Sequence, residues 1–362
     1  MLRYLTRWYA GKFDSTEPAV FIAVVIIAVI IISFFGNLLA PILAGVIIAY
    51  LLEAIVNVLS RWLRIKRIFA VYLVFLLFIA ALVLLIVFLL PKLTHQAAEF
   101  FQSIPQQIKN LRASFFALSQ KYPAILSEAQ IQGAINAISN IQLDKLASIS
   151  QYLIKFSLAS LPSLITWLVY LFIVPLLVFF FLKDKDRISV WFVSMLPEER
   201  GALEEVWSDM RPQLGNYVKG KTLECIIVSI ATYIGFIYFN LNYALLMAIF
   251  VGLSVLIPYI GMVVVTIPVA LIGLGQFGVS STFFYMFLVY LIIQALDGNL
   301  LVPLLYSEAL SLHPVAVIAA VLIFGGIWGF WGLFFAIPLA ALINAAIKMW
   351  VRRKLSSSPS VS

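Results

Sequence analysis

The chain has 362 residues, of which 64% are hydrophobic and only 11% are charged. This composition excludes an ordinary soluble domain, which is less apolar and more charged, and it predicts an all-α protein that spans the membrane repeatedly. The net charge is +8, but Lys and Arg cluster beside apolar segments, which indicates membrane topology rather than nucleic-acid binding.

The residues on which most enzymes depend are scarce. Cys225 is the one cysteine, which excludes an intrachain disulfide and a cysteine zinc site, and His95 and His313 are too isolated for a metal cluster. The sequence contains no H-E-x-x-H, G-x-S-x-G or G-x-x-x-x-G-K-[ST] motif. We therefore expect no enzyme, no catalytic residue, no metal, no cofactor and no ATPase on this chain.

Residues 1–91 are predicted to form three membrane spans, each near the ~20 apolar residues that a bilayer requires. These spans cover residues 19–35, 41–59 and 69–90. We expect a turn at Gly36 and Asn37 after the first span and a stop at Pro91 after the third. Because Arg and Lys crowd residues 60–67, the loop between the second and third spans is predicted to be cytoplasmic.

Residues 92–155 are predicted to form an extracytoplasmic amphipathic helical segment. Apolar side chains recur there at a and d positions of three heptads: Phe101, Ile104, Ile108, Leu111, Phe115 and Leu118. Two interpretations stay open. The segment packs against itself and the membrane surface, or it forms a subunit contact.

Residues 156–182 are predicted to contain the fourth span, and residues 183–221 to form amphipathic helices at the cytoplasmic interface. In the latter segment apolar residues recur at helical spacing among acids: Leu203, Val206, Trp207, Met210, Leu214 and Tyr217. This pattern favours a helix that lies on the lipid surface over a ligand site.

Residues 222–350 are predicted to form spans five to eight, and residues 351–362 a disordered cytoplasmic tail. The four spans cover residues 222–239, 243–274, 282–306 and 315–350. Helix breakers interrupt the last three of them: Pro258, Gly261, Pro268, Pro303, Gly325, Gly326 and Pro338.

The distribution of positive charge predicts a chain of about eight spans with both termini in the cytoplasm. Of the 24 Lys and Arg residues, 18 fall in segments that this topology assigns to the cytoplasm. If spans six and eight were both re-entrant hairpins, the number of membrane crossings would still be even and both termini would still be cytoplasmic. This alternative remains open.

Asp297 is the strongest functional candidate because an acid inside a membrane span is a functional-site hypothesis by default. Helical spacing places Tyr290, Gln294 and Asp297 on one face. Asn299 and Pro303 follow, and a helix broken there would expose the backbone groups with which transporters bind ions or polar solutes. The alternative is that Asp297 caps a helix end.

The segment of Pro258, Tyr259 and Gly261 is predicted to be a hinge or gate opposite Asp297, or else a packing kink.

Two further acids are secondary candidates. Glu224 follows Lys221 by three residues, which favours an interfacial ion pair. Glu53 could line an inner vestibule or pair with Arg61 or Arg64.

Successive motifs of this chain resemble those of the autoinducer-2 exporter family. They are Pro41 with residues 49–53, then 180–184, 217–221, 257–261, 294–303, 312–314 and 329–338. Their order covers nearly the whole chain. The chain departs from the family pattern at Asp297, where the family carries a glutamate, so the carboxylate here reaches one carbon less far.

The resemblance implies a homo-oligomeric protein of the bacterial inner membrane with about eight spans. Members are associated with export of autoinducer-2, a small, neutral, hydroxyl-rich molecule, and others with sodium–proton antiport. We expect a secondary transporter that moves a small polar solute outward, with Asp297, Asn299 and Gln294 as binding residues. A cation–proton antiporter, in which Asp297 binds proton and cation in turn, is the nearest alternative. A third is a non-transporting oligomeric scaffold acting through residues 92–155 or 183–221.

Overall fold

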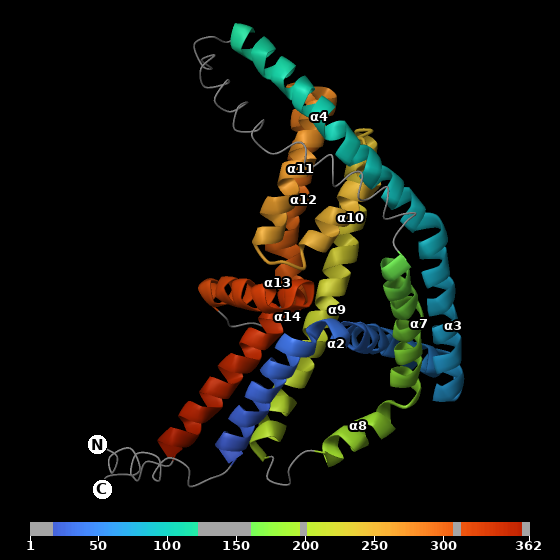
Figure 1. The fold of residues 1–362 in the computed structure, drawn as a ribbon, viewed down its shortest axis with the longest axis vertical. Coiled ribbons are helices and arrows are strands. Elements are labelled where there is room, and N and C mark those ends of the chain that lie inside the picture. Colours follow the sequence, from blue (N-terminus) through green and yellow to red (C-terminus); the bar gives the residue numbers. More distant parts are fainter. Residues whose placement is uncertain (1–16, 122–160, 196–200, 307–312, 357–362) are drawn as a thin grey trace. The chain divides into compact units, whose positions relative to one another are not determined.

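The computed structural model describes residues 17–121, 161–195, 201–306 and 313–356. Every regular element in these ranges is a helix (Figure 1), in agreement with the predicted all-α class. The chain divides into two compact units. Unit one comprises Met1–Leu76, Val169–Gly220 and Tyr306–Ser362, and unit two comprises Leu77–Leu168 and Lys221–Leu305.

Unit one contains the long helices of the chain ends and the short helix that follows the fourth predicted span. Its elements are α2 (Glu17–Trp62), the start of α3 (Arg67–Leu84), most of α7 (Leu161–Lys183), α8 (Lys185–Ser194), the first half of α9 (Gly201–Tyr238) and α14 (Pro314–Ser356). Helix α2 packs against α14 and closely against α7. A Cβ atom at Gly45 would lie 2.9 Å from the Leu177 Cβ atom, so the α2–α7 approach requires glycine.

Unit two contains the largest buried core described. Its elements are π-helix η1 (Leu85–Leu89), α4 (Leu90–Lys121), the second half of α9, α10 (Ala244–Ser254), α11 (Ile260–Phe277), α12 (Ser281–Leu296), π-helix η2 (Asp297–Leu301) and most of α13 (Val302–Tyr306). Helix α4 packs on α10 and α11. Ile104 and Ile108 of the predicted heptad stripe, together with the neighbouring Phe100, join that core, so part of the stripe is buried within its own chain. Residues 122–155 lie outside the described residues.

Helices α10 and α11 form a hairpin in the region predicted as span six. Helix α10 has 11 residues and rises only about 16 Å, roughly half the hydrocarbon thickness of a bilayer. The chain then turns at residues 255–259, where Tyr259 has φ 62°. A Cβ atom on Gly261 would overlap the Ser254 carbonyl oxygen, so the tight turn requires glycine there. The two helices pack against each other.

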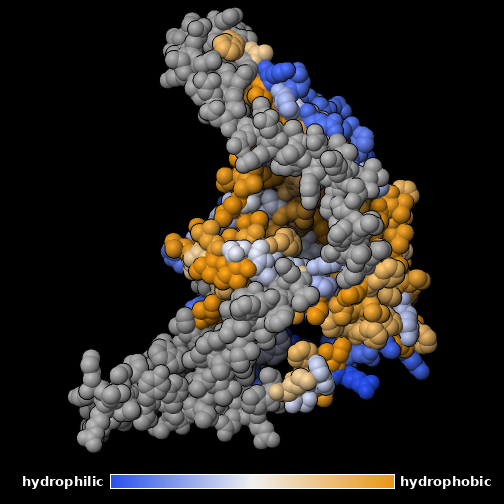
Figure 2. Space-filling model, in the orientation of Figure 1, coloured by the Kyte–Doolittle hydropathy of each residue, from blue (hydrophilic) through white to orange (hydrophobic). Residues whose placement is uncertain are grey.

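Six helical segments within the described residues are long and apolar enough to cross a membrane. They are Leu39–Trp62, Arg67–Leu111, Trp207–Tyr238, Ile260–Phe277, Ser281–Leu305 and Pro314–Ala345. The apolar helices Tyr170–Lys183 and Ala244–Ser254 are shorter. Most apolar side chains of these segments point outward, and Figure 2 shows them in orange over α3 and α7, with the hydrophilic face of α4 in blue. Outward apolar side chains are those that would contact lipid.

Helices continue through several of the predicted boundaries. Helix α2 is one helix of 46 residues that passes through Gly36, Asn37 and Pro41 without a turn. Helix α9 likewise crosses residue 221, where an interfacial segment was expected to end. Helix α14 extends to Ser356, into the segment predicted as a disordered tail, and residues 357–362 lie outside the described part.

Pro91 does not end a helix, and π-helices explain why. In η1 the Leu90 N–H donates to the Leu85 carbonyl five residues earlier, directly before Pro91. In η2 the Val302 N–H donates to the Asp297 carbonyl, directly before Pro303. Because proline lacks an N–H and clashes with the carbonyl four residues earlier, the wider π turn lets each helix continue through its proline.

The break in the last predicted span lies at Gly329 rather than at Gly325 and Gly326. Gly329 has φ 59° and ψ −134°, a conformation outside the helical region, and it divides α14 into two arms. A Cβ atom on Gly332 would overlap the Phe324 carbonyl oxygen, which shows how sharply the chain bends. Pro338 lies within the second arm.

Candidate functional site

Asp297 opens the π-helix η2 and is buried, with 8% of its surface exposed. Its Oδ1 atom has no hydrogen-bond partner. Three residues earlier on the same face, Gln294 is 6% exposed and its Nε2 atom also lacks a partner. Because unsatisfied buried polar groups are rare and costly, two of them on one helix face make this face the candidate binding site.

Lys221 and Glu224 of α9 form a buried ion pair beside Asp297. The Lys221 Nζ atom lies 2.8 Å from Glu224 Oε2, and the two residues are 5% and 2% exposed. Asp297 interacts electrostatically with both residues. The i, i+3 spacing predicted this ion pair, but at the membrane interface, whereas the structure buries both residues inside the protein.

Lys221 also reaches the turn of the α10–α11 hairpin. Its Nζ atom donates a hydrogen bond of 2.7 Å to the carbonyl oxygen of Val255, the C-cap residue of α10. The last carbonyls of a helix lack helical donors, so this lysine satisfies one of them. Sequence reasoning missed this contact, which joins residues 34 positions apart.

Thr232 is a further buried polar residue of α9, the helix whose Phe236 contacts Tyr290 of α12. Glu224 and Asp297 interact electrostatically, and about three turns further along α9 the Phe236 ring stacks on Tyr290 at 6.2 Å. Thr232 precedes Phe236 by one turn, as Gln294 follows Tyr290 by one turn. Thr232 is fully buried, and its Oγ1 atom lacks a hydrogen-bond partner.

The residues Lys221, Glu224, Thr232, Gln294 and Asp297 are called the polar cluster below. It holds one ammonium group and two carboxylates, so the charges do not balance when all three are ionised. Its unpaired atoms include an acceptor, a donor and a hydroxyl that can act as either. The cluster can therefore bind a proton or cation at the carboxylate, or a molecule that offers both hydrogen-bond donors and acceptors.

The other predicted residues of this unit lie in different settings. Tyr290 is fully buried, and its hydroxyl oxygen lies 2.7 Å from Thr266 Oγ1. Asn299 is exposed, and its Nδ2 atom donates to the Ala295 carbonyl of its own helix, so its side chain supports η2 locally. Pro258, Tyr259 and Gly261 form the hairpin turn, in which Gly261 is buried and Tyr259 is 60% exposed.

Glu53 belongs to unit one, apart from the polar cluster. Its carboxylate pairs with Arg67 at 3.0 Å and with Lys185 at 3.3 Å, so the predicted pairing with Arg61 or Arg64 is wrong. Arg67 also donates to the Leu182 carbonyl near the end of α7. These contacts join the ends of α2, α3 and α7, which is a structural role.

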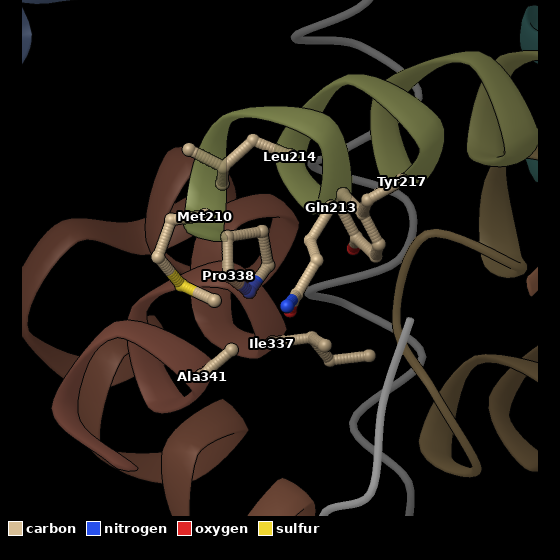
Figure 3. Close-up of a pocket in the computed structure, with 7 residues that line it drawn as sticks. All are labelled: Met210, Gln213, Leu214, Tyr217, Ile337, Pro338 and Ala341. Carbon is tan, nitrogen blue, oxygen red and sulfur yellow. The ribbon is translucent and has the colours of Figure 1, made fainter. Parts of the chain in front are cut away.

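Unit one also contains a small pocket between α9 and the second arm of α14 (Figure 3). Its lining is mostly apolar and comprises Met210, Gln213, Leu214, Tyr217, Ile337, Pro338 and Ala341. No charged side chain is among them. In the described part of the chain, no group of three or more His, Cys, Asp and Glu side chains could hold a metal ion.

Comparisons with known proteins identify the family. The model of the AI-2E family transporter matches residues 20–352. The "Putative permease PerM" of Escherichia coli K12 is 45% identical over 97% of this chain and 98% of that protein. The "Putative transport protein YueF" of Bacillus subtilis 168 is 28% identical over 87% of this chain and 84% of that protein. The chain therefore belongs to the AI-2E transporter family and is a multi-pass membrane protein of the transporter class.

Proposed function

We propose that this protein is a secondary transporter that exports a small, hydroxyl-rich polar solute, of the class of autoinducer-2, across the bacterial inner membrane. Solute binds at the polar cluster, and Asp297 is the principal ligand. Both termini lie in the cytoplasm, because this arrangement puts most Lys and Arg residues on the cytoplasmic side.

The observation that carries this proposal is the buried, unpaired Asp297 Oδ1 atom beside the unpaired Gln294 Nε2 atom. A hydroxyl group can donate to the carboxylate and accept from the amide, so neighbouring hydroxyls on one molecule satisfy both atoms. A bare cation would satisfy the carboxylate alone. The three-residue spacing of Gln294 and Asp297 fits a solute only a few atoms long.

A cation–proton antiporter is the second candidate, and the excess of carboxylates over ammonium groups in the polar cluster favours it. An unbalanced buried carboxylate takes up a proton or a cation readily. In that mechanism Asp297 would exchange the two across the membrane, and Gln294 would have no direct role.

The test uses purified protein in liposomes, with a panel of small polyols and monovalent cations, with and without a proton gradient. Export of a polyol that saturates with concentration supports the first proposal. The Asp297→Asn variant separates the two candidates. Antiport requires a group that ionises and must vanish in this variant, whereas the introduced amide retains an acceptor oxygen and should keep part of the polyol flux. A chain that moves no solute and no cation would favour a membrane scaffold.

A further inference from the structure

The α10–α11 hairpin carries no charge of its own. Residues 244–277 contain no Asp, Glu, Lys, Arg or His. The ionisable residues of α4 with a described exposure, Lys92, His95, Glu99 and Lys109, are all exposed. Among the described residues, the buried charged side chains that can pass a response to this hairpin therefore belong to α9 and η2.

Lys221 is the described charged side chain that holds the turn of the hairpin. Its Nζ atom donates to the Val255 carbonyl at 2.7 Å and to both carboxylate oxygens of Glu224 at 2.8 Å and 3.1 Å. Beside this pair, the Cys225 side chain is hydrogen-bonded to Ser229. An ammonium group has three donors in all, so a new acceptor for Lys221 competes with these contacts.

The Asp297 carboxylate is the candidate for such an acceptor. It interacts electrostatically with Lys221, and its Oδ1 atom has no hydrogen-bond partner in the described arrangement. A charged, empty Asp297 attracts the ammonium group strongly in the poorly screened interior. A neutral or occupied Asp297 leaves the ammonium group with Glu224 and Val255.

We propose that Lys221 is a positioning residue of the transport cycle, which holds the hairpin turn through Val255 while Asp297 is neutral or occupied and releases it when Asp297 is an empty carboxylate. This inference rests on the proposed function, since it assumes that Asp297 changes its charge or occupancy during transport. The bistable element is the turn at residues 255–259, where helical hydrogen bonding is interrupted. Gly252 keeps the end of α10 close to α9, because a Cβ atom there would lie 2.7 Å from the Cys225 carbonyl oxygen.

The test is amide hydrogen exchange of residues 253–262 in the full chain in lipid nanodiscs, at about pH 8.5, where an aspartate of ordinary acidity is ionised. Wild type is compared with Asp297→Asn. Each is also made in a background of Lys221→Met with Glu224→Met, which removes both charges of the pair at similar volume and so avoids an unpaired buried charge.

We expect Asp297→Asn to slow amide exchange at the turn by about tenfold in the wild-type background. In the Lys221→Met, Glu224→Met background exchange is already fast, and Asp297→Asn should slow it by less than about twofold. Residues 263–272 of α11 serve as an internal control and keep their rate. Equal or faster exchange in Asp297→Asn, or the same slowing in both backgrounds, overturns the inference.

Failure of this inference and failure of the proposed function give different results. If Asp297→Asn slows amide exchange at the turn only when Lys221 and Glu224 are present, but no solute moves in liposomes, the link from Asp297 to the turn is kept and the transporter is rejected. Solute flux without coupled exchange would retain the transporter and reject Lys221 as the positioning residue.

Discussion

The Tyr217 hydroxyl donates a hydrogen bond of 2.9 Å to the carbonyl oxygen of Phe334. Phe334 lies four residues before Pro338, whose missing N–H leaves that carbonyl without its helical donor. The two rings also meet edge to face at 6.1 Å. A tyrosine of α9 thus satisfies the backbone group that a proline of α14 leaves unpaired.

Replacing Tyr217 with Phe should therefore destabilise the protein by about 1–3 kcal/mol, because it leaves a buried carbonyl unsatisfied. The measurement is reversible unfolding in detergent. Pro338→Ala provides the control, since it restores the N–H donor. In that background the cost of Tyr217→Phe should fall well below its cost in wild type, and equal costs would show that the hydrogen bond does not compensate for the proline.

Lys221→Met should be among the most damaging substitutions in unit two. It leaves the Glu224 carboxylate buried without its counter-ion and should cost about 3–5 kcal/mol. Adding Glu224→Met should recover most of this loss. Lys109→Met on the exposed face of α4 is the matched control and should leave the unfolding midpoint nearly unchanged. A double variant, Lys221→Met with Glu224→Met, that is no more stable than Lys221→Met alone would contradict this account.

The buried face of α12 could be predicted from the sequence, whereas its partners could not. Tyr290, Gln294 and Asp297 recur at helical spacing, and all three are buried. Their neighbours depend on how α9 and the hairpin pack, which periodicity does not encode. The bond from Lys221 to Val255 is of this kind, because nothing local in either segment predicts it.

Helix breakers were the least reliable part of the sequence reasoning, for a physical reason. Pro91 and Pro303 both follow π-helices that absorb them, and Pro338 is compensated by a tyrosine from another helix. Whether a proline breaks a helix thus depends on a register shift or a tertiary partner. Gly329 breaks α14, whereas the nearby Gly325 and Gly326 do not. All three are glycines, so the residue type alone does not predict the break.

Gly329 and Gly326 should respond in opposite ways to alanine. Gly329 has φ 59° and ψ −134°, a region that L-residues avoid, so Gly329→Ala should cost on the order of 1–3 kcal/mol. Gly326 lies in the helical arm with open space at its Cβ position, so Gly326→Ala should stabilise by about 0.5–1 kcal/mol. The measurement is the unfolding midpoint of each variant. Equal effects would mean that the bend at Gly329 adapts to a side chain.

Gln294 offers a test in which stability and transport should separate. Its Nε2 atom is buried without a partner, so Gln294→Met removes a desolvation cost of about 1–3 kcal/mol and should keep or raise the unfolding midpoint. The same change removes the donor proposed to bind solute, so solute flux into liposomes should fall by about tenfold, the usual value of one hydrogen bond to a ligand.

Gln276 is the matched control for this substitution. Its Nε2 atom donates to the Asn240 carbonyl, and its Oε1 atom accepts from the Asn242 N–H. Gln276→Met should therefore lower the unfolding midpoint slightly, because it removes two hydrogen bonds to backbone groups that water can then pair, while flux per folded molecule stays near that of wild type. If Gln294→Met behaves like Gln276→Met, with lost stability and retained flux, then the Gln294 amide serves packing, and the solute does not bind beside Asp297.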